Sequence, residues 1–215
     1  MADVGAPAVG LVLVEDGKAG ADSMYGQDGD DTYRAGSTAD LAIETNATAA
    51  GGFDRVLSAV SFTLGANVER LVLEGTNAIS GTGSALANAI AGNNGNNLIN
   101  GMLGSDSLSG GLGIDNFYFT TALGPANIDR IADFTPADDL IRLDDAVFTG
   151  MSLGYLRAAA FHVGTASADA SDRIIYDSAT GMVYFDADGL GGAAQTAFAK
   201  LSAGLALTTA DFYVF

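Results

Sequence analysis

The sequence predicts an all-β protein: a parallel β-roll (a β-solenoid) of nonapeptide repeats, followed by a β-rich C-terminal cap. Three observations predict this fold class. A nine-residue phrase recurs with glycines, an Asp or Asn, and an apolar residue at fixed positions. The 215 residues include 29 glycines, and only four of the 26 acidic residues are glutamates, so residues that favour turns are abundant. Short segments of alternating apolar and polar residues, typical of strands, lie outside the repeats.

The repeat is clearest in five nonads, which cover residues 17–25, 26–34, 92–100, 101–109 and 110–118. Position one is glycine in all of them: Gly17, Gly26, Gly92, Gly101 and Gly110. Position four is also glycine: Gly20, Gly29, Gly95, Gly104 and Gly113. Position six is an Asp or Asn: Asp22, Asp31, Asn97, Asp106 and Asp115. Position eight is apolar or aromatic: Met24, Tyr33, Ile99, Leu108 and Phe117. A degraded nonad at 83–91 keeps Gly83, Asn88 and Ile90.

Each nonad is expected to form one short strand and one tight turn. Glycine at positions one and four is expected to take positive φ, which allows the chain to turn without a Cβ clash. The residues around position eight are expected to be extended, with one apolar side chain pointing inward. Two nonads then make one coil, and the turns stack into two edges lined with carbonyls and carboxylates. A flexible linker would not need an inward apolar residue at every ninth position, so the pattern favours a roll.

The two edges predict a bound cation. Stacked carboxylates repel each other, and inward-facing carbonyls would lack partners. Calcium accepts about six to eight oxygens in a flexible geometry, so Ca²⁺ is the expected cofactor. The formal net charge of −17 argues against nucleic acid as a partner, because phosphate binding needs Lys and Arg. The chain has no cysteine, which excludes thiolate zinc sites.

The remaining elements follow in chain order. Residues 56–64 and 69–74 are expected to be strands of longer coils between the two nonad arrays, 17–34 and 83–118. Residues 1–118 would then form the roll and residues 119–215 the cap. In the cap, strands are expected at 128–134 and 140–143, and a hairpin joins 173–176 to 182–185. The spacing of apolar residues predicts helices at 155–161 and 193–202.

These residues resemble the hemolysin-type calcium-binding repeats of RTX proteins. The phrase at 54–75, the strand pair at 128–143 and the hairpin at 174–192 are similar to units that accompany RTX arrays. The resemblance implies a bacterial type I secretion substrate that an ABC transporter exports and that folds on binding extracellular Ca²⁺. It also implies an uncleaved C-terminal export signal, which Asp211–Phe215 fits. Met1–Val4 lacks the basic and apolar regions of a Sec signal peptide.

The resemblance also implies a set of calcium ligands. In RTX rolls the ion lies between coils two nonads apart, held by position-six side chains and by carbonyls of the glycine loops. This pairs Asn88 with Asp106 and Asn97 with Asp115, and leaves the partners of Asp22 and Asp31 open. The implied carbonyl donors lie in the turns of Gly20, Gly29, Gly104 and Gly113. Asp186 and Asp188 are a further candidate oxygen cluster, or equally the polar end of a hairpin.

Two departures from the family pattern predict few and modest calcium sites. Asparagine at position six carries no charge. Position two holds Lys18, Gln27, Asn93 and Met102, where the family prefers glycine.

No enzymatic function is expected from this chain. Gly150–Gly154 matches the G-x-S-x-G nucleophile elbow, but the elbow needs a strand before it, a helix after it and a distant histidine. The only histidine, His162, is too close in sequence, so catalysis by Ser152 is not expected. The alternatives to a free-standing secreted module are the C-terminal part of a larger secreted lipase or protease, and a segment of a surface-layer or adhesin protein.

Overall fold

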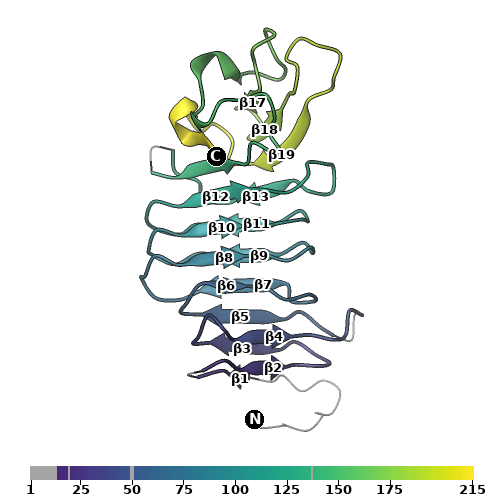
Figure 1. The fold of residues 1–215 in the computed structure, drawn as a ribbon, viewed down its shortest axis with the longest axis vertical. Coiled ribbons are helices and arrows are strands. Elements are labelled where there is room, and N and C mark those ends of the chain that lie inside the picture. The colour runs from purple at the N-terminus through teal and green to yellow at the C-terminus, as the bar shows by residue number, and fades with distance from the viewer. Residues whose placement is uncertain (1–13, 19, 49–50, 137) are drawn as a thin grey trace.

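A computed structural model describes residues 14–18, 20–48, 51–136 and 138–215 of the chain. The strands stack one above another from β1 to β12 and β13, and β17, β18 and β19 lie at the far end of the stack (Figure 1). The predicted fold class is confirmed: an all-β parallel roll with a β-rich C-terminal cap. Met1–Val4, where a Sec signal was not expected, lies outside the described residues.

Two faces make up the roll. One face is a parallel series of strands within the larger sheet: β1 (Val14–Asp16), β3 (Thr32–Ala35), β5 (Arg55–Ser58), β7 (Arg70–Leu73), β9 (Ala89–Ala91), β11 (Ser107–Ser109) and β13 (Asp129–Ile131). The alternate strands form two further parallel sheets: β2 (Ser23–Tyr25) with β4 (Leu41–Ile43), and β6 (Phe62–Thr63), β8 (Ser80–Thr82), β10 (Leu98–Asn100), β12 (Asn116–Phe119) and β14 (Leu140–Leu143). The expected strands at 56–64 and 69–74 therefore belong to the roll, as β5, β6 and β7.

The side chains at position eight form a thin core between the faces. Met24, Tyr33, Ile99, Leu108 and Phe117 are all buried, as predicted. Burying a side chain of this size stabilises the fold by about 1.5 to 3 kcal/mol. Because each coil contributes only two such side chains, the core alone provides little surplus against the conformational entropy of the glycine-rich turns.

The turns use glycine differently from the expectation. At position four, Gly20, Gly29, Gly104 and Gly113 have φ of +130°, +105°, +120° and +115°, as predicted, but Gly95 does not take positive φ. The position-one glycines do not take positive φ, so that part of the prediction was wrong. They are needed for close approach, because a Cβ on Gly101 would lie 2.2 Å from Asp106 Oδ2.

Positive φ falls instead on position two. Lys18, Gln27 and Met102 have φ of 46°, 74° and 71°, and Gly111 has 93°. A residue with a Cβ is strained in this left-handed region. This explains why glycine is suited to position two. Lys18, Gln27 and Met102 are each expected to lower the stability of the roll.

The cap continues the sheets of the roll. It contains β15 (Gly154–Tyr155), the 3₁₀ turn η1 (Ala158–Ala160), β16 (Phe161–Val163), β17 (Ile174–Asp177), β18 (Met182–Phe185), β19 (Thr196–Lys200), the 3₁₀ turn η2 (Thr209–Asp211) and β20 (Phe212–Val214). Strand β19 pairs parallel with β13 and antiparallel with β18, and β20 pairs parallel with β14. The predicted hairpin is confirmed, because β17 and β18 pair antiparallel with Ile174 opposite Phe185.

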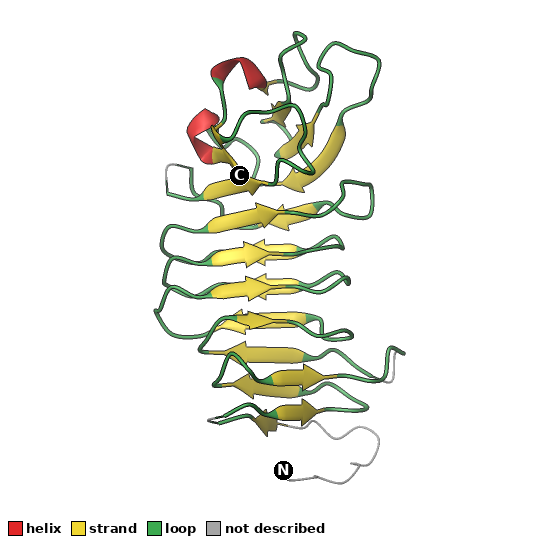
Figure 2. Ribbon diagram, in the orientation of Figure 1, coloured by secondary structure: helices red, strands yellow, loops and turns green. Residues whose placement is uncertain are grey.

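Both predicted helices were wrong. Residues 155–161 comprise the end of β15, the turn η1 and the start of β16, and residues 193–202 contain strand β19 (Figure 2). The helical spacing of Ala194, Ala197 and Phe198 is outweighed by backbone pairing on both sides of β19. Phe198 is buried, with its ring centroid 4.9 Å from that of Phe148.

Relief of the position-two strain should stabilise the roll. We expect Gln27→Gly and Met102→Gly each to raise the free energy of unfolding by up to about 1 kcal/mol, because glycine adopts the left-handed region without a Cβ clash. Chemical denaturation measures the effect. Asn93→Gly is the matched control: Asn93 also occupies position two, but its φ is not positive and its side chain donates to Glu74 O and Asn77 O. That variant should lose stability, and a similar loss in Met102→Gly would contradict the strain argument.

Candidate metal-binding edges

The turns of the roll stack into two edges. We call the turns that lead into the odd-numbered strands β3 to β13 the odd edge, and those that lead into β2 to β14 the even edge. In most of these turns an Asp or Asn stands at position six or its equivalent, just before the strand or, for Asp129, as its first residue, and most of these residues are buried. The odd edge carries Asp31, Asp54, Asn88, Asp106 and Asp129. The even edge carries Asp22, Asp40, Asn97, Asp115 and Asp139.

One hydrogen bond recurs along both edges. In six of the carboxylates, those of Asp40, Asp54, Asp106, Asp115, Asp129 and Asp139, Oδ1 accepts the backbone N–H of the position-six residue one coil earlier. Asp106 Oδ1 accepts from Asn88 at 2.6 Å, and Asp115 Oδ1 accepts from Asn97 at 2.8 Å. The two residues of each bond are 18 apart in sequence, which is one coil of two nonads. The structure therefore brings together both pairs that the sequence suggested.

The structure also supplies partners that the sequence analysis missed. The N–H groups of Asp22 and Asp31 donate to Asp40 Oδ1 and Asp54 Oδ1, at 3.0 and 2.7 Å. Above the second array, Asp106 and Asp115 donate in the same way to Asp129 and Asp139. The signal that would have found these four residues is an aspartate two positions before an inward apolar residue, as in Asp129–Arg130–Ile131. Their turns lack the glycine phrase, which concealed the match.

The two asparagines begin the second array differently. Asn88 Nδ2 donates to Val68 O at 3.0 Å, and Asn97 Nδ2 donates to Ile79 O at 3.0 Å. Both side-chain oxygens accept backbone N–H groups of their own turns, from Ser84 and Asn93. The amide thus donates to the longer coil below and accepts from its own turn, whereas a carboxylate could only accept.

The carboxylates of Asp106 and Asp115 each retain an oxygen that the protein does not satisfy. Oδ2 of both residues is buried and has no hydrogen-bond partner. Beside these atoms stand Gly101 and Gly110, where a Cβ would lie 2.2 and 2.1 Å from the oxygen. A buried, unpaired carboxylate oxygen is costly unless a cation or proton compensates it. The all-oxygen environment and the space beside it fit Ca²⁺.

Burial changes the acidity of these groups. It raises the pKa of Asp115 to about 6 and that of Asp54 to about 6, from an ordinary value of 3.8. Burial, together with the nearby carboxylates, also raises the pKa of Asp139. Asp106 and Asp129 have raised pKa values because both are buried. Without a cation, these edges favour bound protons, and protons and cations compete for the same oxygens.

The second predicted oxygen cluster lies in the cap, after β18. Asp186 Oδ1 accepts from the N–H groups of Asp188 and Gly189, and its Oδ2 accepts from the Ser167 hydroxyl. Burial alone would raise the pKa of Asp186, but these hydrogen bonds lower it. Asp188 Oδ2 accepts from Ala193 N–H at 3.2 Å. These contacts describe a well-capped turn, and a role for Asp186 and Asp188 in binding an ion stays a prediction.

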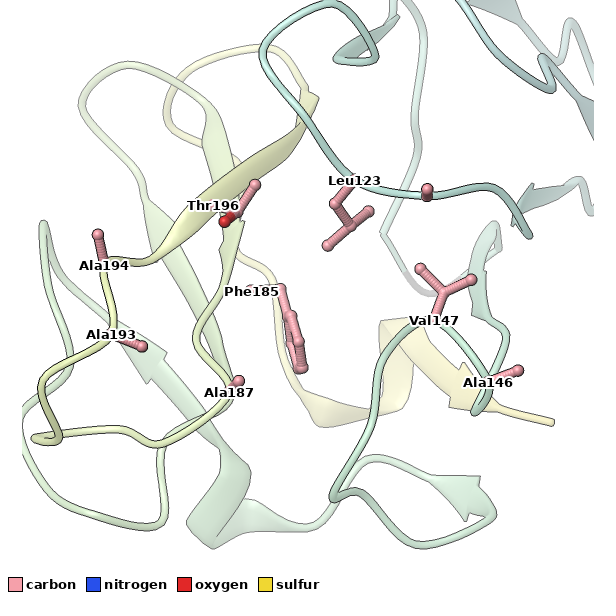
Figure 3. A pocket seen from close by; sticks show the side chains of 9 residues that line it. Leu123, Ala146, Val147, Phe185, Ala187, Ala193, Ala194 and Thr196 are labelled. Carbon is pink, nitrogen blue, oxygen red and sulfur yellow. The ribbon is translucent and has the colours of Figure 1, made fainter.

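Neither the serine motif nor a hollow in the cap adds a site. Ser152 is exposed and precedes strand β15, so the strand and helix of a nucleophile elbow do not flank it. His162 Nδ1 lies 4.0 Å from Asp172 Oδ2. A hollow of about 510 Å³ in the cap is lined by Leu123, Val147, Phe185, Thr196 and neighbouring alanines (Figure 3). Its lining offers no charged side chain, so the edges remain the candidate site.

Comparison with known proteins identifies the repeats whose turns form these edges. The family model described as RTX calcium-binding nonapeptide repeat matches in four copies, over residues 16–42 and 82–117. These two segments of the chain therefore contain RTX nonapeptide repeats of the calcium-binding type. The chain is similar to the solution structure of the AlgE6R3 subunit from the Azotobacter vinelandii mannuronan C5-epimerase, with 20% identity and a TM-score of 0.32. That match covers 97% of this chain and 85% of the other.

Two further comparisons are negative. No curated protein sequence matches the chain significantly. Among the described residues, none of the helical segments is long and apolar enough to cross a membrane.

The raised pKa values of the edge carboxyls predict how the calcium-free protein responds to pH. A carboxyl with a raised folded-state pKa stabilises the fold below its unfolded value, and this contribution is lost as the pH rises through the folded value. For Asp115 the window runs from 3.8 to about 6. In calcium-free buffer near pH 3.8, the Asp115→Asn variant should have the same free energy of unfolding as the wild type. Above about pH 6, the free energy of unfolding of the variant should exceed that of the wild type by about 1 to 2 kcal/mol.

Denaturation across the pH series measures this difference. Asp177→Asn is the control, because Asp177 has a lowered pKa through hydrogen bonds from Thr180. Its difference from the wild type should have the opposite sign. A difference for Asp115→Asn that does not vary with pH would show that the carboxyl is not held protonated by burial.

Proposed function

We propose that this chain, whose RTX repeats form a calcium-binding β-roll, is a secreted module that folds when it binds extracellular Ca²⁺. The observation that carries the proposal is the buried, unpartnered Oδ2 of Asp106 and Asp115, each beside a glycine that leaves space for an ion. The proposal assigns no catalytic residue to the chain.

The chain's own groups have distinct parts in this function. Asp106 and Asp115 provide charged oxygens, and Asn88 and Asn97 provide neutral ones one coil earlier. The turns of Gly20, Gly29, Gly104 and Gly113 are held open at positive φ, which suits their carbonyls as further donors. Asp22 with Asp40, and Asp31 with Asp54, provide the corresponding oxygens in the first array. A bound calcium ion supplies the positive charge that the stacked carboxylates lack.

The energetics favour a switch. An ion that binds only the folded state stabilises it by about 1.4 kcal/mol when its concentration is about tenfold above Kd. The net stability of a domain is on the order of 5 to 15 kcal/mol, so a few sites can decide whether the roll is folded. Without calcium, the net charge of −17 and the buried carboxylates oppose folding.

Export in the unfolded state is the second part of the proposal. We assign the signal for an ABC-type exporter to the end of the chain, including Asp211–Phe215. In the folded protein, Phe212 and Val214 are fully buried and β20 pairs with β14 and β15. A transporter could read this segment only before folding. Low calcium inside the cell and high calcium outside would separate the two events.

A calcium titration tests the folding proposal. We expect added calcium to increase β-sheet content and the melting temperature, and chelation to reverse both. Asp106→Asn and Asp115→Asn should each weaken binding by about tenfold, because each loses the charged ligand of its pair. Circular dichroism and calorimetry measure these effects. Ser152→Ala is the control and should behave as the wild type. Wild-type affinity in both Asp variants would show that the ligands were assigned to the wrong residues.

Truncation tests the export proposal. Deletion from Leu201 onward should abolish secretion through a type I apparatus, because the proposed signal is removed. The combined variant Asp106→Asn/Asp115→Asn should still reach the medium but fold poorly there. Immunoblotting of cells and medium separates the outcomes. Equal secretion of the truncated and intact chains would contradict a signal in this segment.

A further inference from the structure

Three carboxylates meet on the odd edge below the second array, in an arrangement that the nonads do not predict. One oxygen from each of Asp31, Glu44 and Asp54 lies within 4.8 Å of the other two. All three residues are buried, with 1%, 6% and 1% of their surfaces exposed. Asp31 and Asp54 are a position-six pair like those above, but Glu44 has no counterpart in the other turns.

The register of the roll explains how Glu44 reaches this place. Strands β2 and β4 pair with Tyr25 opposite Ile43, so the next residues, Gly26 and Glu44, are stacked. Gly26 is position one of its nonad, and Glu44 stands where the next coil would have its own position-one glycine. A Cβ on Gly26 would lie 2.1 Å from Glu44 Oε1 and 2.5 Å from Asp31 Oδ2. The glycine thus leaves space for the glutamate to enter the edge.

Hydrogen bonds fix the orientation of these side chains. The Tyr33 hydroxyl donates to Glu44 Oε1, and the Asp31 N–H donates to Asp54 Oδ1 at 2.7 Å. Asn67 Nδ2 donates to the Glu44 carbonyl oxygen at 3.2 Å. The second oxygen, Glu44 Oε2, is buried and has no hydrogen-bond partner. The cluster therefore contains a carboxylate oxygen that is positioned but not satisfied.

The geometry of the cluster favours a bound cation. Three buried carboxylates this close together repel one another, and the buried Oε2 of Glu44 has no hydrogen-bond partner. We propose that Asp31, Glu44 and Asp54 form a separate calcium site, with Glu44 as the additional charged ligand.

Calcium is the cation that fits this set of ligands. The ligands are all oxygens, as hard cations require. They come from two connections, β2–β3 for Asp31 and β4–β5 for Glu44 and Asp54, which suits the flexible coordination of Ca²⁺ better than the tight octahedron of Mg²⁺. Since affinity increases with the number of charged ligands, this site should bind more tightly than the Asn–Asp pairs of the second array. The inference rests on the proposed calcium function for the identity of the ion; it shares Asp31 and Asp54 with that proposal and adds Glu44 as the ligand that the nonads do not supply.

Tyr33 allows this site to be detected separately from the other calcium sites by luminescence. Terbium replaces calcium at oxygen sites, and a tyrosine that contacts the site can transfer excitation energy to it; the chain has no tryptophan to compete. We expect terbium luminescence excited through tyrosine in the wild type, and its displacement by calcium. Tyr33→Phe should lose most of the signal while keeping the same number of calcium ions bound.

The test of the ligand is Glu44→Gln, with Glu74→Gln as the matched control. Glu74 is the partner of Arg34 and its side chain is 44% exposed, so its variant has the same change of charge outside the cluster. Glu44→Gln should remove one calcium ion per chain, or weaken one site by about tenfold or more. It should also remove the tyrosine-excited signal, whereas Glu74→Gln should change neither. Asp115→Asn should weaken calcium binding in the second array and leave the terbium signal intact.

The outcomes separate the two proposals. If the wild type binds calcium but Glu44→Gln binds the same number of ions with unchanged affinity, the separate site is wrong and the calcium-binding roll stands. A tyrosine-excited signal that persists in Tyr33→Phe also contradicts the site. If the wild type binds no calcium, both proposals fail. Circular dichroism checks that Glu44→Gln is folded. If Glu44→Gln is unfolded, the luminescence of Tyr33→Phe tests the site instead.

Discussion

The stacking of buried carboxylates one coil apart is the constraint on which the rest of this roll depends. A period of 18 residues places Asp106 and Asp115 directly over the backbone of Asn88 and Asn97, and the same stacking continues to Asp129 and Asp139. One oxygen of each carboxylate accepts a backbone N–H group from the coil below. In Asp106 and Asp115 the second oxygen is buried without a hydrogen-bond partner, so the geometry that satisfies the backbone also creates the demand for a cation.

The rest of the sequence accommodates this stacking. Position one must be glycine because a Cβ would collide with the position-six side chain of the same nonad, as at Gly101 and Gly110. Asparagine serves where the array meets the longer coils below, since its amide can donate to Val68 O or Ile79 O. Where the chain departs from glycine at position one, as at Glu44, the space is shared with the glycine one coil earlier and a third carboxylate enters. Each exception is therefore local and leaves the register unchanged.

Much of this could be predicted from the sequence, and the failures have physical causes. Nine-residue periodicity fixes the inward residues and the two edges, because a strand alternates faces whatever its neighbours are. Periodicity could not show whether Gly101 is needed for its φ or for its missing Cβ. It also could not reveal Asp54 or Asp129, whose coils are lengthened so that the partner lies 23 residues away instead of 18. The helical spacing of apolar residues predicts a helix at 193–202, and only pairing with β13 and β18 makes this segment a strand.

The cap has a thermodynamic part in the roll as well as a topological one. In a stacked architecture each coil contacts only its neighbours, so the end coils are the least protected. Strand β19 pairs with β13, whose first residue is Asp129, and β20 pairs with β14, which directly follows Asp139. Asp129 and Asp139 are the last carboxylates of the odd edge and the even edge. Covering these strands buries Ile131 and Ile141 and holds the two carboxylates against the nonads below. The final residues of the chain thus stabilise the same edges that would bind calcium, which couples completion of the cap to closure of the ion-binding turns.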